Sequence, residues 1–124
     1  MRMSLSLVNE FIHLIEAKNL DAAVALVTDD CEYDNVPMRK VFGPEAIKGG
    51  LASFLAPATR VEWKILREAE SGGIVFNERI DEFDFPTGNI AIPVTGVFEV
   101  RDGKIVLWRD YFDLQTFVNQ MPKA

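Results

Sequence analysis

The stretch NERIDEFDF, residues 77–85, decides the fold, because its residues alternate as they do in a β-strand. Residues two apart in a strand project from the same face and lie about 6.6 Å apart along it. Arg79 and Asp81 therefore share a face, and strand parity adds Val75 and Phe83 to it. The pattern predicts a strand whose inner side sets an ion pair into an apolar wall.

Strand-like runs continue on both sides of this stretch. From residue 59 to residue 113 the hydrophobic period is two, in four runs separated by turn sequences at 71–73, 86–89 and 101–103. These runs predict an antiparallel meander, and Pro93 and Gly96 can bend its third run. A shorter alternating segment at 31–36 predicts a fifth strand.

The first half of the chain predicts helices. Apolar residues recur at steps of three and four over 5–18, a second helix is predicted over 20–27 with Asn19 as its N-cap, and Pro44 begins a third that runs to residue 55. Helices followed by an antiparallel sheet are typical of the α+β class. We expect one domain over 1–124, with a curved sheet that wraps around the helices and encloses a pocket.

Composition excludes several kinds of partner. The 124 residues include 13 basic and 19 acidic ones, for a formal charge of −6, which disfavours nucleic acid and anionic membranes. One cysteine, Cys31, and one histidine give neither an internal disulfide nor a zinc site, so no metal is expected. The first residues lack a signal-peptide pattern, and no run of about 18 apolar residues occurs. These features predict a soluble cytoplasmic protein.

A second carboxylate falls on an apolar face in the last run, residues 104–113. Strand parity places Val106, Trp108, Asp110 and Phe112 together. An unpartnered ionised carboxylate among such neighbours is costly, so it must be protonated or lie beside a cation. Arg79 is the natural partner.

The candidate constellation is Arg79, Asp81 and Asp110, with Tyr33 and Asn35 as neutral hydrogen-bonding groups from another strand. One arginine balances one carboxylate, so the second aspartate is best kept protonated in a dry pocket. One acid and one base suit the attack of water on a strained or activated carbon. The alternative is a buried network that only orders the sheet, and the pattern by itself leaves both open.

Three segments carry a family resemblance. They are EYDN at 32–35 followed by Pro37 and Met38, RIDEF at 79–83 and LWRDYFDL at 107–114. In order and spacing the chain resembles the limonene-1,2-epoxide hydrolases, which have the NTF2-like cone fold. The resemblance implies hydration of an epoxide in one step, with no metal, cofactor or covalent enzyme intermediate. It also implies a homodimer.

The resemblance further implies a role for each member of the constellation. Asp110 would be the base that deprotonates water, and Tyr33 and Asn35 would hold that water. Asp81 would be the acid that protonates the epoxide oxygen. Arg79 would bridge the two aspartates, in agreement with the charge argument.

Apolar walls predict a small apolar epoxide, cyclic or bulky, as the partner besides water. Two rival functions remain on the same fold: an isomerase or cyclase of the ketosteroid isomerase type, and a non-catalytic module that binds a ligand or a protein. Each predicted wall residue can equally belong to the core. These residues are Met38, Phe83, Ile92, Val94, Trp108 and Phe112.

Overall fold

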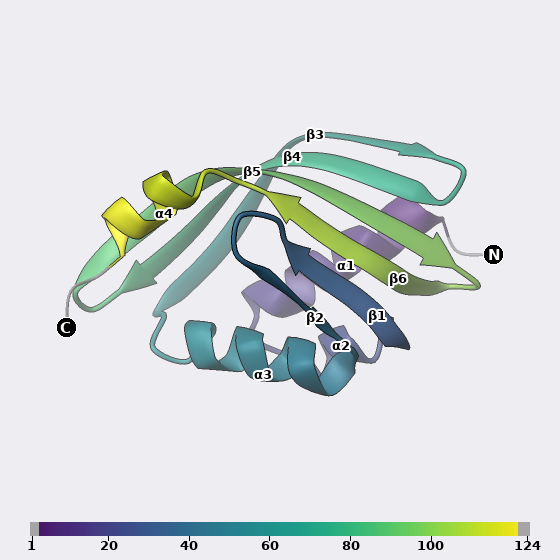
Figure 1. Ribbon diagram of the computed structural model, residues 1–124, viewed down its shortest axis with the longest axis horizontal. Helices are drawn as coiled ribbons and strands as arrows, with labels where there is room; N and C mark the ends of the chain where they lie inside the picture. Colours follow the sequence, from purple (N-terminus) through teal and green to yellow (C-terminus); the bar gives the residue numbers. More distant parts are fainter. Residues whose placement is uncertain (1–2, 122–124) are drawn as a thin grey trace.

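The computed structural model describes residues 3–121 of the chain (Figure 1). Helices α1 to α3 lie on one side of a curved sheet, and α4 lies against β5 near the C-terminus. In chain order the elements are α1 (Ser4–Glu16), α2 (Leu20–Val24), β1 (Val27–Asn35), β2 (Arg39–Phe42), α3 (Pro44–Leu55), β3 (Arg60–Ser71), β4 (Ile74–Phe85), β5 (Gly88–Arg101), β6 (Lys104–Tyr111) and α4 (Leu114–Gln120).

The six strands form one mixed sheet in the order β2-β1-β6-β5-β4-β3. Strands β3 to β6 are joined as the predicted antiparallel meander, and β1 runs parallel to β6. The sheet curves over the helices and does not close into a barrel (Figure 1). The α+β class and the helix-covered, curved sheet are therefore confirmed.

Two elements escaped the sequence analysis, and two boundaries were wrong: the end of the second helix and the start of the strand predicted over 31–36, which begins at Val27. β2 has only four residues, of which two are basic, so it carries no hydrophobic alternation. α4 has only seven residues and none of them is fully buried, so its apolar residues span too short a stretch to establish a helical period. The helix predicted over 20–27 ends at Val24, because Val27 already pairs with Ile105 of β6 as the start of β1.

An irregularity in β6 changes which of its side chains face inward. Glu99 pairs with Leu107 but Val100 pairs with Ile105, so Val106 has no partner in the ladder. Ile105 is fully buried, whereas Val106 is half-buried. The prediction that Val106 shares the face of Trp108 was therefore wrong, since a bulge shifts strand parity by one residue.

The core lies between α1 and the inner face of the sheet. Phe11 and Ile15 of α1 are fully buried, and the Phe11 ring meets Trp108 edge to face at 5.0 Å between ring centroids. Asn19 caps α2 as predicted, since its Oδ1 accepts from the amide of Ala22. Within residues 3–121, every helix is too short or too polar to cross a membrane.

Candidate active site

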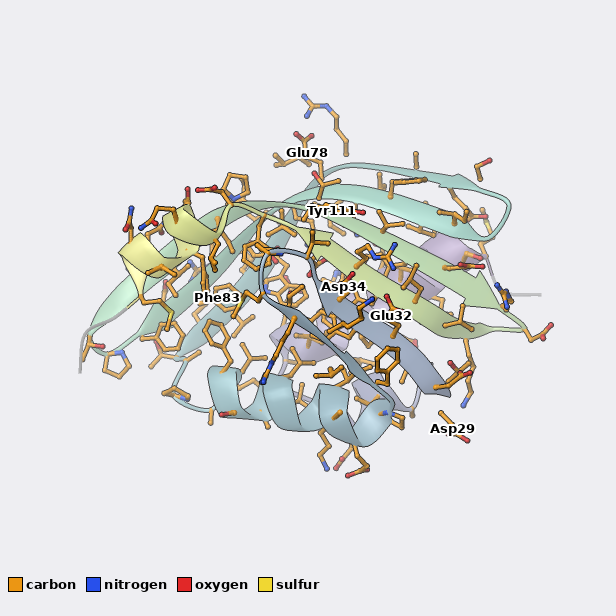
Figure 2. All side chains as sticks on the ribbon, in the orientation of Figure 1. Asp29, Glu32, Asp34, Glu78, Phe83 and Tyr111 are labelled. Atoms are coloured by element: carbon orange, nitrogen blue, oxygen red, sulfur yellow. The ribbon has the colours of Figure 1, made fainter. Side chains whose placement is uncertain are left out.

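Strand β4 carries a row of polar side chains on its inner face. Asn77, Arg79, Asp81 and Phe83 alternate with exposed or half-buried residues, as period two requires. Figure 2 shows Phe83 between the sheet and α3, and Glu78 on the outer face. Arg79 is 0% exposed and Asp81 is 3% exposed. The ion pair predicted from the spacing is thus fully inside the protein.

The guanidinium of Arg79 joins the two aspartates. Its Nε and Nη2 donate to Oδ1 and Oδ2 of Asp81, both at 2.9 Å, which is the bidentate geometry of a strong charge-assisted pair. Nη2 also donates to Oδ2 of Asp110 at 3.2 Å. The structure therefore brings together the three charged residues that the sequence analysis placed in one constellation.

Asp110 of β6 accepts a hydrogen bond at each of its two carboxylate oxygens, one from Trp108 and one from Arg79. It is 4% exposed, and its Oδ1 accepts from the indole Nε1 of Trp108 at 3.0 Å. Strand register aligns it with Asn35 of β1 and with Gly96 of β5. Asp110 thus lies between the neutral polar groups of β1 and the ion pair of β4.

Tyr33 and Asn35 of β1 lie next to Asp110 of β6, as predicted. The ring of Tyr33 stacks on Trp108, with 3.7 Å between centroids and 8° between planes. Burial and the nearby charge of Asp110 raise the pKa of Tyr33 above its usual range. The phenol is therefore a neutral hydroxyl that can donate a hydrogen bond.

Asp81 has the environment of a proton donor. Burial raises its pKa to about 6, against the opposing effect of Arg79. The charges of Asp110 and Glu16 add to the increase. Asp81 is thus suited to hold a proton up to about pH 6, well above the usual range of an aspartate.

Three further residues support the guanidinium, and the sequence analysis missed all of them. Asn77 is 2% exposed, and its Oδ1 accepts from Nη1 of Arg79 at 2.8 Å. The Trp63 ring lies below the guanidinium, with Cζ of Arg79 5.1 Å from its centroid. Gly96 faces Nη1 of Arg79 with no side chain between them. Alternation could have found Asn77, which lies two residues before Arg79.

A cavity of about 210 Å³ opens beside this network. Asp81, Asp110, Tyr33, Asn35 and Arg39 contribute its polar side chains, and most of the remaining wall is apolar. The wall consists of Tyr33, Asn35, Met38, Arg39, Val41, Ala46, Gly50, Leu51, Phe54, Leu55, Trp63, Asp81, Phe83, Ile92, Val94, Asp110, Phe112 and Phe117.

Five of the six predicted wall residues line this cavity, and one does not. Trp108 is fully buried below Tyr33, and its indole is committed to Asp110. It supports the site from the core, so its assignment as a wall residue is corrected. The five that line the cavity are Met38, Phe83, Ile92, Val94 and Phe112.

Aromatic residues from two helices complete the wall opposite the sheet. Phe54 of α3 lies 5.0 Å from Phe83 and 5.8 Å from Phe117 of α4, measured between ring centroids. Gln120 holds α4 on the sheet by bonding both the amide and the carbonyl of Ala91. Phe117 was missed because its wall position depends on where a short helix docks.

Metal chemistry has no evident ligand set in this part of the chain. Across residues 3–121 there is no group of three or more histidine, cysteine or acidic side chains placed to hold a metal ion. Both aspartates of the site spend their oxygens on Arg79 and Trp108. Two aspartates joined by an arginine at the edge of an apolar cavity are an arrangement that can give and take protons.

Comparison with known proteins points to one family. Residues 3–123 match the family described as limonene-1,2-epoxide hydrolase catalytic domain. The chain is 34% identical over 107 residues to epoxide hydrolase EphG of Mycobacterium tuberculosis, covering 86% of this chain and 71% of that protein.

Solved structures agree with that match. The structure of an M. tuberculosis LEH-like epoxide hydrolase superposes with a TM-score of 0.84 at 31% identity, covering 94% of this chain and 87% of the other. A putative SnoaL-like polyketide cyclase from Shewanella putrefaciens CN-32 reaches a TM-score of 0.87 at 17% identity, covering 97% and 96% of the two chains. The second likeness is one of fold, and it confirms the expected NTF2-like class.

Proposed function

Because this chain belongs to the limonene-1,2-epoxide hydrolase family, we infer that it is an epoxide hydrolase of that type. We propose that it adds water to an apolar, cyclic or bulky epoxide and releases a vicinal diol in one step. The observation that carries the proposal is the hydrogen bonding of one buried arginine to two aspartates at the edge of an apolar cavity.

The proposed step divides acid and base work between the two aspartates. Asp110 takes a proton from a water molecule that Tyr33 and Asn35 hold, and the water oxygen forms a bond to an epoxide carbon. The C–O bond of the ring breaks, and Asp81 gives its proton to the departing oxygen. Release of ring strain and two aligned proton transfers lower the barrier together.

Arg79 keeps the charges of the site in order throughout this step. Before reaction it neutralises Asp110, and afterwards it can neutralise Asp81, because it contacts both carboxylates. The negative charge thus moves from Asp110 to Asp81, and both carboxylates stay in contact with the guanidinium of Arg79. Return of a proton from Asp110 to Asp81, through solvent, restores the starting state.

A fixed arginine also disfavours the isomerase and cyclase alternative. Stabilisation of an enolate requires neutral donors beside the carbonyl oxygen, such as a phenol or a protonated carboxyl group. Here the guanidinium contacts both carboxyl groups, so it holds one aspartate ionised beside the aspartate that carries the proton. Water addition uses this arrangement more directly than enolate chemistry does.

Labelled water tests the proposed function. Incubation of the protein with cyclohexene oxide in ¹⁸O-water under single-turnover conditions is expected to give a diol carrying one label. A covalent ester intermediate would instead deliver an unlabelled protein oxygen to the first product and leave the label in the protein. Label found in the protein would reject direct attack by water, and absence of any diol from a panel of epoxides would reject the activity.

Turnover is expected to fall as the pH rises above about 6, because the raised pKa of Asp81 sets where this donor loses its proton. Below that pH the carboxyl group is protonated and can donate, and above it the carboxylate cannot. The measurement is kcat/KM against pH, corrected for uncatalysed hydrolysis. Arg79, Asp110 and Glu16 act on the same titration, so the observed value belongs to the coupled group. If kcat/KM does not fall on the alkaline side of the profile, Asp81 is not the proton donor.

Homodimer formation and cofactor independence stay predictions from the sequence. Phe76 and Tyr111 are nearly half exposed on the outer face of the sheet, where a second copy could cover them. Light scattering of the purified protein measures the mass in solution, and a monomer at working concentration would reject the dimer.

Activity that survives exhaustive dialysis against a chelator is the result expected of an enzyme without a metal.

A further inference from the structure

Arg39 is the positively charged residue of the cavity wall, and the proposed reaction gives it no role. It begins β2 directly across the hairpin from Asn35, with which it pairs in register. Its side chain is exposed, whereas Asp81 and Asp110 are buried. Arg39 therefore stands at the open end of the cavity, and the two aspartates stand at the inner end.

Arg39 is also the arginine that lacks a partner in the part of the chain that the structure describes. The others within residues 3–121 all form ion pairs: Arg60, Arg67, Arg79, Arg101 and Arg109. Lys40, the next residue, lies 4.0 Å from Glu32. An unpaired guanidinium is unexpected in a chain with a net charge of −6, in which carboxylates outnumber cations.

The cavity offers Arg39 no counter-ion of its own. The only carboxylates in its wall, as far as residues 3–121 are concerned, are Asp81 and Asp110, and both are bonded to Arg79. Between the two ends the wall is apolar, with Phe54, Phe83 and other hydrocarbon side chains. A molecule that matches this cavity has a hydrocarbon body and one anionic end.

We propose that Arg39 is a binding site for a carboxylate on the substrate, so that the preferred substrate is an epoxide whose apolar skeleton also bears a carboxylate group. The planar guanidinium fork fits a carboxylate through two parallel hydrogen bonds. With the carboxylate at the opening, the epoxide ring is directed toward Asp81 and Asp110. This inference rests on the proposed function for the reaction, but the carboxylate site can be tested separately.

The test uses two epoxides with the same ring skeleton, 3,4-epoxycyclohexanecarboxylate and its uncharged methyl ester. The wild-type protein is expected to prefer the carboxylate by about 10-fold in kcat/KM, through a lower KM, as one partly exposed charge-assisted contact allows. The preference is expected to vanish in Arg39→Gln, to survive in part in Arg39→Lys and to weaken with added salt. Lys40→Gln removes the neighbouring charge outside the cavity wall and is expected to keep the full preference.

A binding measurement separates this inference from the reaction itself. Calorimetry with cyclohexanecarboxylate, which cannot react, is expected to detect binding to the wild type that Arg39→Gln loses and Lys40→Gln retains. Equal kcat/KM values for acid and ester in the wild type, or an unchanged preference in Arg39→Gln, would overturn the carboxylate site. If cyclohexene oxide is hydrolysed but the acid is not preferred, or the preference does not depend on Arg39, only the carboxylate site is rejected. If no epoxide is hydrolysed but carboxylate binding depends on Arg39, only the proposed reaction fails.

Discussion

Replacement of Asp110 by asparagine is expected to lower kcat by about 10²–10⁴-fold, the usual contribution of a general base. The amide keeps the shape of the side chain and an oxygen for the hydrogen bond from Trp108, but it cannot accept the proton of the attacking water. The measurement is kcat with cyclohexene oxide, with circular dichroism and thermal melting as checks of the fold. Folded Asp110→Asn protein with full activity would remove this residue from the mechanism.

Asp81→Asn is expected to lose activity to a similar extent for the complementary reason, since an amide cannot give up a proton to the epoxide oxygen. Asp84→Asn is the matched control. Asp84 lies on the same strand, but its carboxylate pairs with Arg60 outside the cavity wall. We expect the control to retain wild-type kcat. A control as damaged as Asp81→Asn would point to a structural effect along β4 rather than to proton donation.

Gly96→Ala is expected to cost more than about 10²-fold in kcat, although residue 96 touches no substrate. A Cβ at this position would clash with Nη1 of Arg79 and would lie 2.7 Å from Oδ1 of Asn77 and 3.0 Å from Oδ1 of Asp110. The guanidinium cannot move aside without breaking its bonds to both aspartates. Displacements of about 1 Å are enough for losses of this size. A lower melting temperature is expected as well, because overpacking a buried site costs about 1–3 kcal/mol.

Gly49→Ala provides the control for adding one methyl group. A Cβ built at Gly49, which is exposed in α3, would meet no atom within 4 Å beyond the two neighbouring residues and the backbone of its own helix. Alanine is favoured over glycine by about 0.5–1 kcal/mol inside a helix, so the melting temperature should rise slightly and kcat should stay unchanged. Gly96→Ala protein with wild-type kcat would mean that the network tolerates a shift of Arg79. It would then assign Gly96 only to the bend of β5.

Much of the site could be predicted because strand alternation is a local property and because a buried carboxylate requires a cation wherever the fold places it. The spacing of Arg79 and Asp81 gave their shared face, and the cost of a bare carboxylate gave Asp110 its partner across the sheet. The same parity argument failed for Val106, where the ladder carries a bulge. It also could not separate Trp108 from Phe112, because parity gives the face of a strand and not the depth at which a side chain ends.

Other parts of the site depend on elements that meet only in the folded chain. Phe54 and Phe117 reach the cavity from two helices whose docking no local pattern specifies. Arg39 reaches it from a four-residue strand with no apolar alternation. The positions of these residues follow from packing between distant segments, so a reading of single segments could not place them.

The sequence by itself determined the α+β class, the meander and the shared face of Arg79 and Asp81, because these follow from hydrophobic period and turn chemistry. Only the tertiary structure decided the register between strands. Asn35, Asp110, Gly96 and Asn77 fall in one row across β1, β6, β5 and β4. A slip of one residue in any strand would turn its side chains to the other face. That row, fixed by pairing and bulges over the whole sheet, gives Arg79 its second carboxylate, Asp110, and the glycine that leaves room for the guanidinium.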